Sequence, residues 1–130
     1  MVVNVSSLCA IQPFNTWGVY CSGKAARNMF HSTLASEQKQ QQDGKENEEA
    51  AVDQLRVLNY APGPLDTDMQ TEIRQSEGCD KDLHSYFVNS FKEGKLVDPI
   101  VSAERLLNLI LEEGQFESGD HVDFYDLDEK

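Results

Sequence analysis

The residues with the clearest capacity for chemistry are Tyr20 and Lys24, which stand four positions apart. On a helix, residues at i and i+4 lie on one face, so the phenol and the ammonium group would point into the same space. A free tyrosine has a pKa of about 10 and exchanges protons poorly at neutral pH. A nearby ammonium stabilises the phenolate and lowers that pKa, which suits the pair to general acid catalysis on a carbonyl.

This pattern alone is weak evidence for a catalytic site, because an ordinary surface Tyr–Lys pair has the same spacing. A nearby serine strengthens the evidence. Residues 1–6 are short, continuous and rich in β-branched side chains, which is typical of a buried parallel strand. Ser7 follows this strand and precedes Tyr20 by 13 residues. Ligands of doubly wound folds bind outside the carboxyl ends of the strands, where a serine can donate a hydrogen bond to a substrate carbonyl.

A second buried strand is predicted over residues 54–60, and the sequence Ala-Pro-Gly-Pro at 61–64 ends it. The Pro-Gly turn would bring backbone close to a ligand, and Thr67 would open the next helix with a free hydroxyl and backbone N–H groups. Both features place ligand-binding groups after a strand, as Ser7 does.

The remaining segments complete the elements that must position these groups. Helices are predicted near residues 20–34, 68–75, 83–91 and 102–111, with Ser102 as the N-cap and Gly114 as the end of the last one. A final strand fits residues 121–125. This order predicts an α/β fold of the doubly wound, Rossmann type, with a parallel sheet and flanking helices.

Composition excludes several functions. The 130 residues hold 11 Lys and Arg against 23 Asp and Glu, a net charge of -12, which disfavours binding to nucleic acid or to a membrane surface. No apolar run is long enough for an ordinary transmembrane helix. The three cysteines favour a reducing, cytoplasmic setting. His31, His84 and His121 share no metal spacing, so we expect no metal site.

Residues 37–53 differ from the rest of the chain. They carry six acids and two lysines, a net charge of -4, and almost no apolar residues. Such a segment cannot bury enough surface to fold alone. We expect an acidic low-complexity loop or a frayed helical extension there.

Taken together, Ser7, Tyr20-x-x-x-Lys24 and the strand that ends in Pro62-Gly-x-x-x-Thr67 resemble the short-chain dehydrogenase/reductases. The similarity runs from Val2 to Asp126 and is strongest to those members that reduce side-chain carbonyls of pterins. The segments that carry this narrower similarity are residues 4–14, 20–27, 56–69, 94–98 and 118–126.

The resemblance implies a role for each catalytic residue. Tyr20 would donate the proton to the substrate carbonyl, and Ser7 would orient that carbonyl and stabilise its developing charge. Lys24 would lower the pKa of the tyrosine and bind the ribose of the nicotinamide cofactor. The resemblance further implies a homodimer in the intact protein.

The resemblance also implies NADPH as the cofactor and a pterin as the substrate. The implied cofactor-binding residues besides Lys24 are Leu65, Asp66, Thr67, Asp68, Met69 and Gln70. The implied substrate-binding residues are Ser7, Leu8, Tyr20, Gly63 and Asp123. The carboxylate of Asp123 would accept hydrogen bonds from the amino group and the adjacent ring N–H of the pterin.

Two parts of the family pattern are not found. Gly18, Gly23 and Gly44 do not form the Gly-rich turn that holds the dinucleotide pyrophosphate, and the family's active-site Asn before the Ser strand has no counterpart. We therefore expect residues 1–130 to be the C-terminal part of one such domain. Two alternatives to the pterin reductase remain: a non-catalytic truncated product that is unstable or only dimerises, and a reductase of other carbonyls.

Overall fold

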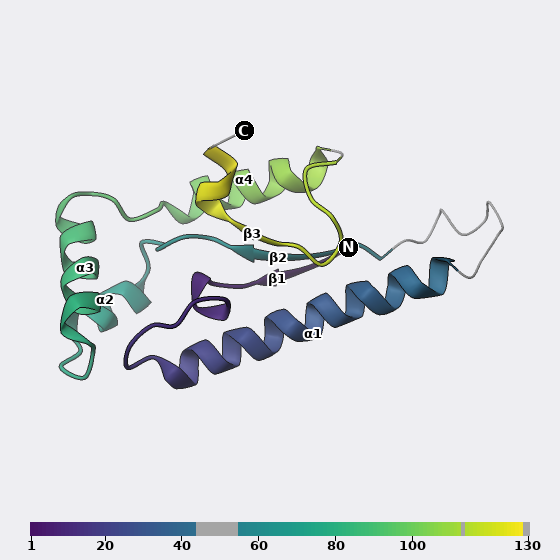
Figure 1. Cartoon of the computed structure of the whole chain (residues 1–130). Coiled ribbons are helices and arrows are strands. Elements are labelled where there is room, and N and C mark those ends of the chain that lie inside the picture. Colours follow the sequence, from purple (N-terminus) through teal and green to yellow (C-terminus); the bar gives the residue numbers. More distant parts are fainter. Residues whose placement is uncertain (44–54, 113, 129–130) are drawn as a thin grey trace.

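A parallel sheet of three strands lies at the centre of the structure, a computed structural model that describes residues 1–43, 55–112 and 114–128 (Figure 1). The strands are β1 (Val2–Val5), β2 (Val57–Ala61) and β3 (His121–Asp123), in the order β1-β2-β3. All of their pairings are parallel, with Asn4 opposite Asn59 and Asn59 opposite His121. The predicted α/β class with a parallel sheet is confirmed.

Helices cover both faces of this sheet. The long helix α1 (Gly18–Asp43) runs along one face, and α4 (Pro99–Leu111) lies against the other (Figure 1). The shorter α2 (Asp68–Gln75) and α3 (Lys81–Lys92) pack on each other beyond the carboxyl end of β2. Helices α2, α3 and α4 each lie within a few residues of a predicted helix, and α1 contains the predicted helix over residues 20–34. None of the described helices combines the length and the hydrophobicity that a bilayer-spanning segment needs.

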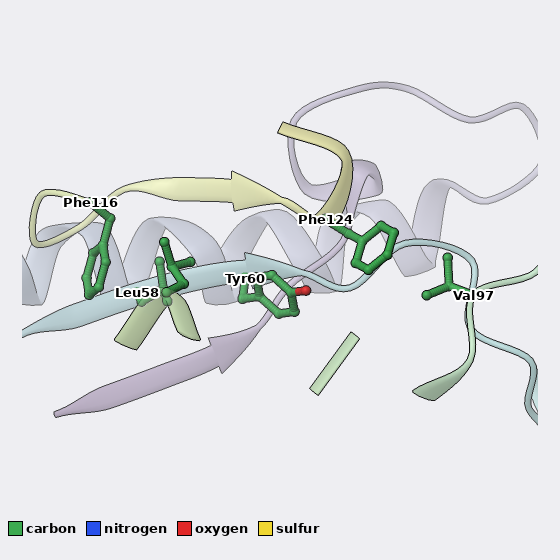
Figure 2. Packing of buried hydrophobic residues seen from close by; sticks show 6 residues of the cluster. Leu58, Tyr60, Val97, Phe116 and Phe124 are labelled. Atoms are coloured by element: carbon green, nitrogen blue, oxygen red, sulfur yellow. The ribbon is translucent and has the colours of Figure 1, made fainter. Parts of the chain in front are cut away.

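The side chains of β2 alternate between the two faces. Leu58 and Tyr60 face α4 and join an apolar cluster with Val97 and Phe124 (Figure 2). Burying side chains of this size stabilises the fold by about 1.5–3 kcal/mol each. The Tyr60 hydroxyl donates to the carbonyl oxygen of Ser102 at 3.1 Å, so its one polar atom is satisfied. This cluster fixes β2 and therefore the turn that follows it.

Helix α1 is longer than the predicted helix over residues 20–34. It continues to Asp43 because Ala35 and the Gln-rich stretch after it are good helix formers, although they lack an apolar face. The expected acidic loop is therefore wrong for residues 37–43, which form the alternative helical extension, and residues 44–53 lie outside the described residues.

The predicted start of the last helix was wrong. Helix α4 begins at Pro99 and is capped by Asp98, whose carboxylate accepts from the backbone N–H of Ile100 at 2.7 Å. Proline at the first helical position favours this start, since its fixed φ suits a helix. Ser102 instead lies inside the helix, is buried, and donates from Oγ to the carbonyl of Pro62 at 3.0 Å. The helix ends at Leu111, before Gly114, which has φ +78°.

The last strand is shorter than predicted. It ends at Asp123, and a 3-10 helix over Phe124–Asp128 follows. Asp126 accepts from the N–H of Asp123 at 3.1 Å, and Asp123 accepts from the N–H of Tyr125 at 3.0 Å. These local bonds compete with strand pairing and turn the chain away from the sheet.

Candidate active site

A cavity of about 310 Å³ opens at the carboxyl ends of β1 and β2. The segment after β1, the turn after β2, and α1, α2 and α3 all contribute to its wall. Several of the residues singled out in the sequence line it: Ser7, Leu8, Tyr20, Lys24, Gly63, Leu65, Thr67, Met69, Gln70 and Asp123. Parallel strands place their carboxyl ends at one edge, which explains why residues so distant in the chain meet there.

Tyr20 lies half-buried in the first turns of α1. Burial in the cavity wall raises the pKa of its phenol, and the nearby Cys9 adds to this effect. A side-chain hydrogen bond with Ser7 acts in the opposite direction. Ser7 also caps the short 3-10 helix Leu8–Ala10, because its Oγ accepts from the N–H of Cys9 at 3.2 Å. The hydroxyl groups of Ser7 and Tyr20 therefore lie next to each other in the cavity wall.

Lys24 reaches the end of β1 and not the tyrosine hydroxyl. Its Nζ donates to the carbonyl oxygens of Val5 at 3.0 Å and Ser6 at 3.4 Å, and lies 5.7 Å from the ring centroid of Tyr20. Burial, followed by the charge of Arg27, lowers the pKa of Lys24. The expectation that Lys24 lowers the tyrosine pKa is not met in this geometry, because desolvation of the phenol dominates and its pKa is raised.

Some residues of the segment from Leu65 to Gln70 line the cavity, and others lie on the surface. Leu65, Thr67, Met69 and Gln70 line the cavity, whereas Asp66 and Asp68 are exposed and lie outside its lining. Thr67 is the N-cap of α2, but its hydroxyl makes no capping hydrogen bond. Gln70 is only 6% exposed, and its Oε1 has no hydrogen-bond partner among the described residues. Two polar groups are thus available at the start of α2.

The remaining predicted substrate residues lie around the cavity mouth. Gly63 has φ +77°, a conformation that other residues adopt at a cost, and an added Cβ would lie 3.1 Å from Cγ2 of Val97. Asp123 projects from the end of β3 with one carboxylate oxygen bound to the N–H of Tyr125. A carboxylate can accept several hydrogen bonds, so Asp123 keeps acceptor capacity for a ligand beside its bond from Tyr125.

An aromatic wall completes the cavity, and most of it was not anticipated from the sequence. The Trp17 ring stacks on Phe87 of α3 with centroids 5.5 Å apart and meets the Tyr20 ring edge-on, also at 5.5 Å. The Phe14 ring also stacks on Trp17, with centroids 6.1 Å apart. Trp17 therefore both lines the cavity and packs against α3.

Within the described ranges, no group of three or more His, Cys, Asp or Glu side chains is placed to hold a metal ion. The three cysteines are free thiols. His31 and His84 each contact a backbone carbonyl through a ring nitrogen, of Arg27 and Arg74 respectively.

Comparison with known families decides the assignment of the fold. The family described as short chain dehydrogenase matches residues 1–78, more than half of the chain. The chain belongs to the short-chain dehydrogenase family. Ser7, Tyr20, Lys24 and Thr67 all fall within the matched residues.

Within the family, the chain is similar to particular reductases. The chain is 47% identical to sepiapterin reductase of Xenopus tropicalis over 97% of its length and 50% identical to that of Meriones unguiculatus over 96%. It is 33% identical to a benzil reductase of Bacillus cereus over 93% of its length. The chain spans about 42% of the length of these sepiapterin reductases and 44% of the benzil reductase.

Solved structures of the family superpose on the chain. The KRED1-Pglu enzyme matches with a TM-score of 0.71 and 30% identity, over 92% of this chain and 45% of that one. A short-chain dehydrogenase/reductase from Saccharomyces cerevisiae matches with a TM-score of 0.69 and 30% identity, over 94% of this chain and 44% of the other.

Proposed function

We propose that this chain carries the carbonyl-reducing site of an NADPH-dependent reductase of pterin side chains, as in sepiapterin reductase. The observation that carries the proposal is the meeting of Ser7, Tyr20, Lys24 and Asp123 in one cavity at the carboxyl edge of the sheet. Similarity to sepiapterin reductases over almost the whole chain supports the pterin as substrate.

The start of α2 fits one end of a nicotinamide cofactor. The buried Oε1 of Gln70, which has no partner within the described ranges, is an acceptor of the kind that a carboxamide N–H requires, and Thr67 lines the same cavity without a capping bond from its hydroxyl. The first N–H groups of α2 favour a phosphate group. Lys24 would bind the ribose hydroxyls, as the family resemblance implies. When bound, NADPH would supply a hydride to the carbonyl carbon.

Residues of the chain would protonate the carbonyl oxygen of the substrate and stabilise its negative charge. Tyr20 donates its phenolic proton to that oxygen, and Ser7 donates a hydrogen bond to it, which stabilises the negative charge as it develops. The raised pKa of Tyr20 keeps the phenol protonated at neutral pH, the form that an acid in a reduction requires. Asp123 would accept from the amino group and the ring N–H of the pterin.

The direct test measures NADPH consumption by the chain with sepiapterin as substrate. We expect Tyr20→Phe to lower kcat by at least about 100-fold, the usual contribution of a general acid. The control is Ser36→Ala, an exposed serine of α1 outside the cavity, which should match the unaltered chain. Retained turnover in Tyr20→Phe would contradict the acid role.

Titration of the chain with NADPH tests the alternative of a non-catalytic product. That alternative requires that cofactor binding be lost, so clear binding heat would exclude it. Absence of both binding and turnover in a folded chain would contradict the proposed activity and favour the non-catalytic product.

A related reductase of other carbonyls is the second candidate. The similarity to a benzil reductase and the aromatic wall of Phe14, Trp17 and Phe87 favour it, because flat aromatic ketones would stack there. Asp123→Ala discriminates between the two. We expect it to raise KM for a pterin by about 10-fold or more while KM for benzil stays unchanged. An unchanged KM for the pterin would favour the second candidate.

We also propose that the intact protein is a cytoplasmic homodimer that pairs through the outer face of α1. Val19, Met29 and Phe30 on this face are 92%, 68% and 66% exposed. Residues 18–36 contain no acid in a chain of net charge -12, so two copies would not repel each other there. Light scattering should show that Phe30→Glu dissociates the dimer, whereas Leu107→Glu on α4 leaves it intact. A monomeric unaltered chain would contradict the proposal.

A further inference from the structure

The side of α1 that faces the sheet carries polar residues at every fourth position: Tyr20, Lys24, Asn28 and Ser32. The three that follow Tyr20 each bond to the sheet or its connections. Lys24 donates to Val5, Asn28 contacts Ser6 after β1 and His121 of β3, and Ser32 donates to the carbonyl of Gly119 at 3.2 Å. Helix and sheet therefore meet through a row of directional bonds, which we call the polar seam of α1.

Asn28 is the residue of the seam that bonds to both the segment after β1 and the start of β3. Its Oδ1 accepts from Oγ of Ser6 at 2.8 Å and contacts Nδ1 of His121 at 3.0 Å. Ser6 is 2% exposed and directly precedes Ser7 at the end of β1. His121 opens β3 and lies 93 residues from Asn28 in sequence. One side-chain oxygen thus joins the helix to β3 and to the residue that follows β1.

This contact fixes the tautomer of His121. A carbonyl oxygen only accepts, so Nδ1 of the ring carries the proton. Nε2 is then unprotonated, and it is buried without a partner among the described residues. Burial accordingly lowers the pKa of His121, while the charges of Asp123 and Asp126 act in the opposite direction. The neutral ring is the form that this arrangement holds.

We infer that Asn28 is a positioning residue for the catalytic pair, anchored by Ser6 and His121. Lys24 and Tyr20 lie one and two turns before Asn28 on the same side of the helix. Apolar contacts are non-directional and tolerate rotation of a helix about its axis, whereas two hydrogen bonds to one oxygen do not. The seam thereby holds the Tyr20 phenol in its position next to Ser7. A displacement of the phenol by about 1 Å would lower the reaction rate by about 100-fold.

Only the kinetic test of this inference, the measurement of kcat, depends on the proposed reductase activity. Asn28→Leu keeps the side-chain size and removes the acceptor, whereas Asn28→Asp keeps an acceptor for both donors. The control is Asn108→Leu, an exposed asparagine of α4. Nuclear magnetic resonance of the Tyr20 ring and of the His121 ring nitrogens, in the full chain, reports the geometry without any substrate.

We expect Asn28→Leu to shift the Tyr20 resonances and to lower kcat for sepiapterin by about 10- to 100-fold with little change in KM. Asn28→Asp should keep the Tyr20 resonances and most of kcat. It should also raise the pKa of His121, because a carboxylate favours the imidazolium. Asn108→Leu should change none of these quantities.

The inference is overturned if Asn28→Leu leaves the Tyr20 resonances unchanged, or if Asn28→Asp leaves the pKa of His121 unchanged. The second measurement decides the matter should Asn28→Leu not fold. A chain that reduces no pterin would contradict the proposed function alone, since both resonance measurements remain valid without turnover.

Discussion

Lys24 donates from Nζ to the backbone carbonyl of Val5 at 3.0 Å, which ties the first half of α1 to the last residue of β1. The ammonium group lies against the edge of the sheet, 5.7 Å from the centre of the Tyr20 ring. Its stabilising effect on a phenolate is weaker there than in direct contact, because the interaction of two charges falls with distance. This geometry explains why burial, and not the charge of Lys24, determines the direction in which the pKa of Tyr20 shifts.

The first prediction concerns the ionisation of Tyr20. Burial raises the pKa of its phenol, so the folded state holds this proton more tightly than the unfolded chain, whose tyrosines ionise at about 10. The stabilisation from this group is complete below the unfolded pKa and is lost as pH rises through the folded one. Ultraviolet titration of the unaltered chain and of Tyr20→Phe should differ by one phenol that ionises above the ordinary value. A difference at or below that value would contradict the burial argument.

Much of this site was visible in the sequence because its residues sit at element ends. Ser7, Tyr20 and Thr67 were predicted at the end of a strand, on one helix face and at a helix start, and the structure has them there. Strand and helix positions follow local periodicity, so the carboxyl edge of a parallel sheet could be located without coordinates.

What the sequence did not reveal depends on contacts between distant segments. The bond from Ser6 to Asn28 and the stacking of Trp17 on Phe87 join residues with no local pattern in common. The helix start at Asp98 was missed for another reason. Ser102 and Asp98 are both good capping residues, and the proline after Asp98 was the signal that distinguishes them.

The second prediction concerns the turn after β2. Gly63→Ala should lower the free energy of unfolding by about 1–2 kcal/mol, because the new Cβ adds strain at φ +77° and lies 3.1 Å from Val97. Gly23→Ala is the matched control. No atom lies within 4 Å of its added Cβ, and alanine in a helix should stabilise the chain by about 0.5–1 kcal/mol. Urea unfolding measures both, and equal effects would refute the proposed strain.

The third prediction separates the two candidate caps of α4. Asp98→Ala removes the acceptor for the N–H of Ile100 and should cost about 0.5–2 kcal/mol. Ser102→Ala should cost a similar amount for a different reason, since the buried Tyr60 hydroxyl and the carbonyl of Pro62 both lose a partner. Hydrogen exchange distinguishes the mechanisms. Asp98→Ala should deprotect the first turn of α4 alone, whereas Ser102→Ala should deprotect β2 as well.

The fourth prediction concerns stability in acid. Burial lowers the pKa of His121, so below the unfolded value of about 6.5 the unfolded chain binds a proton that the folded state takes up less readily. The free energy of unfolding should therefore fall as pH drops from about 7.5 to 5.5. In His121→Gln the side-chain amide can still donate to Asn28 but does not titrate, so that part of the fall should disappear. His31→Gln is the control, because the His31 ring contacts the carbonyl oxygen of Arg27 within its own helix. If His121→Gln keeps the full dependence on pH, another group is responsible and the buried neutral ring is ruled out as its source.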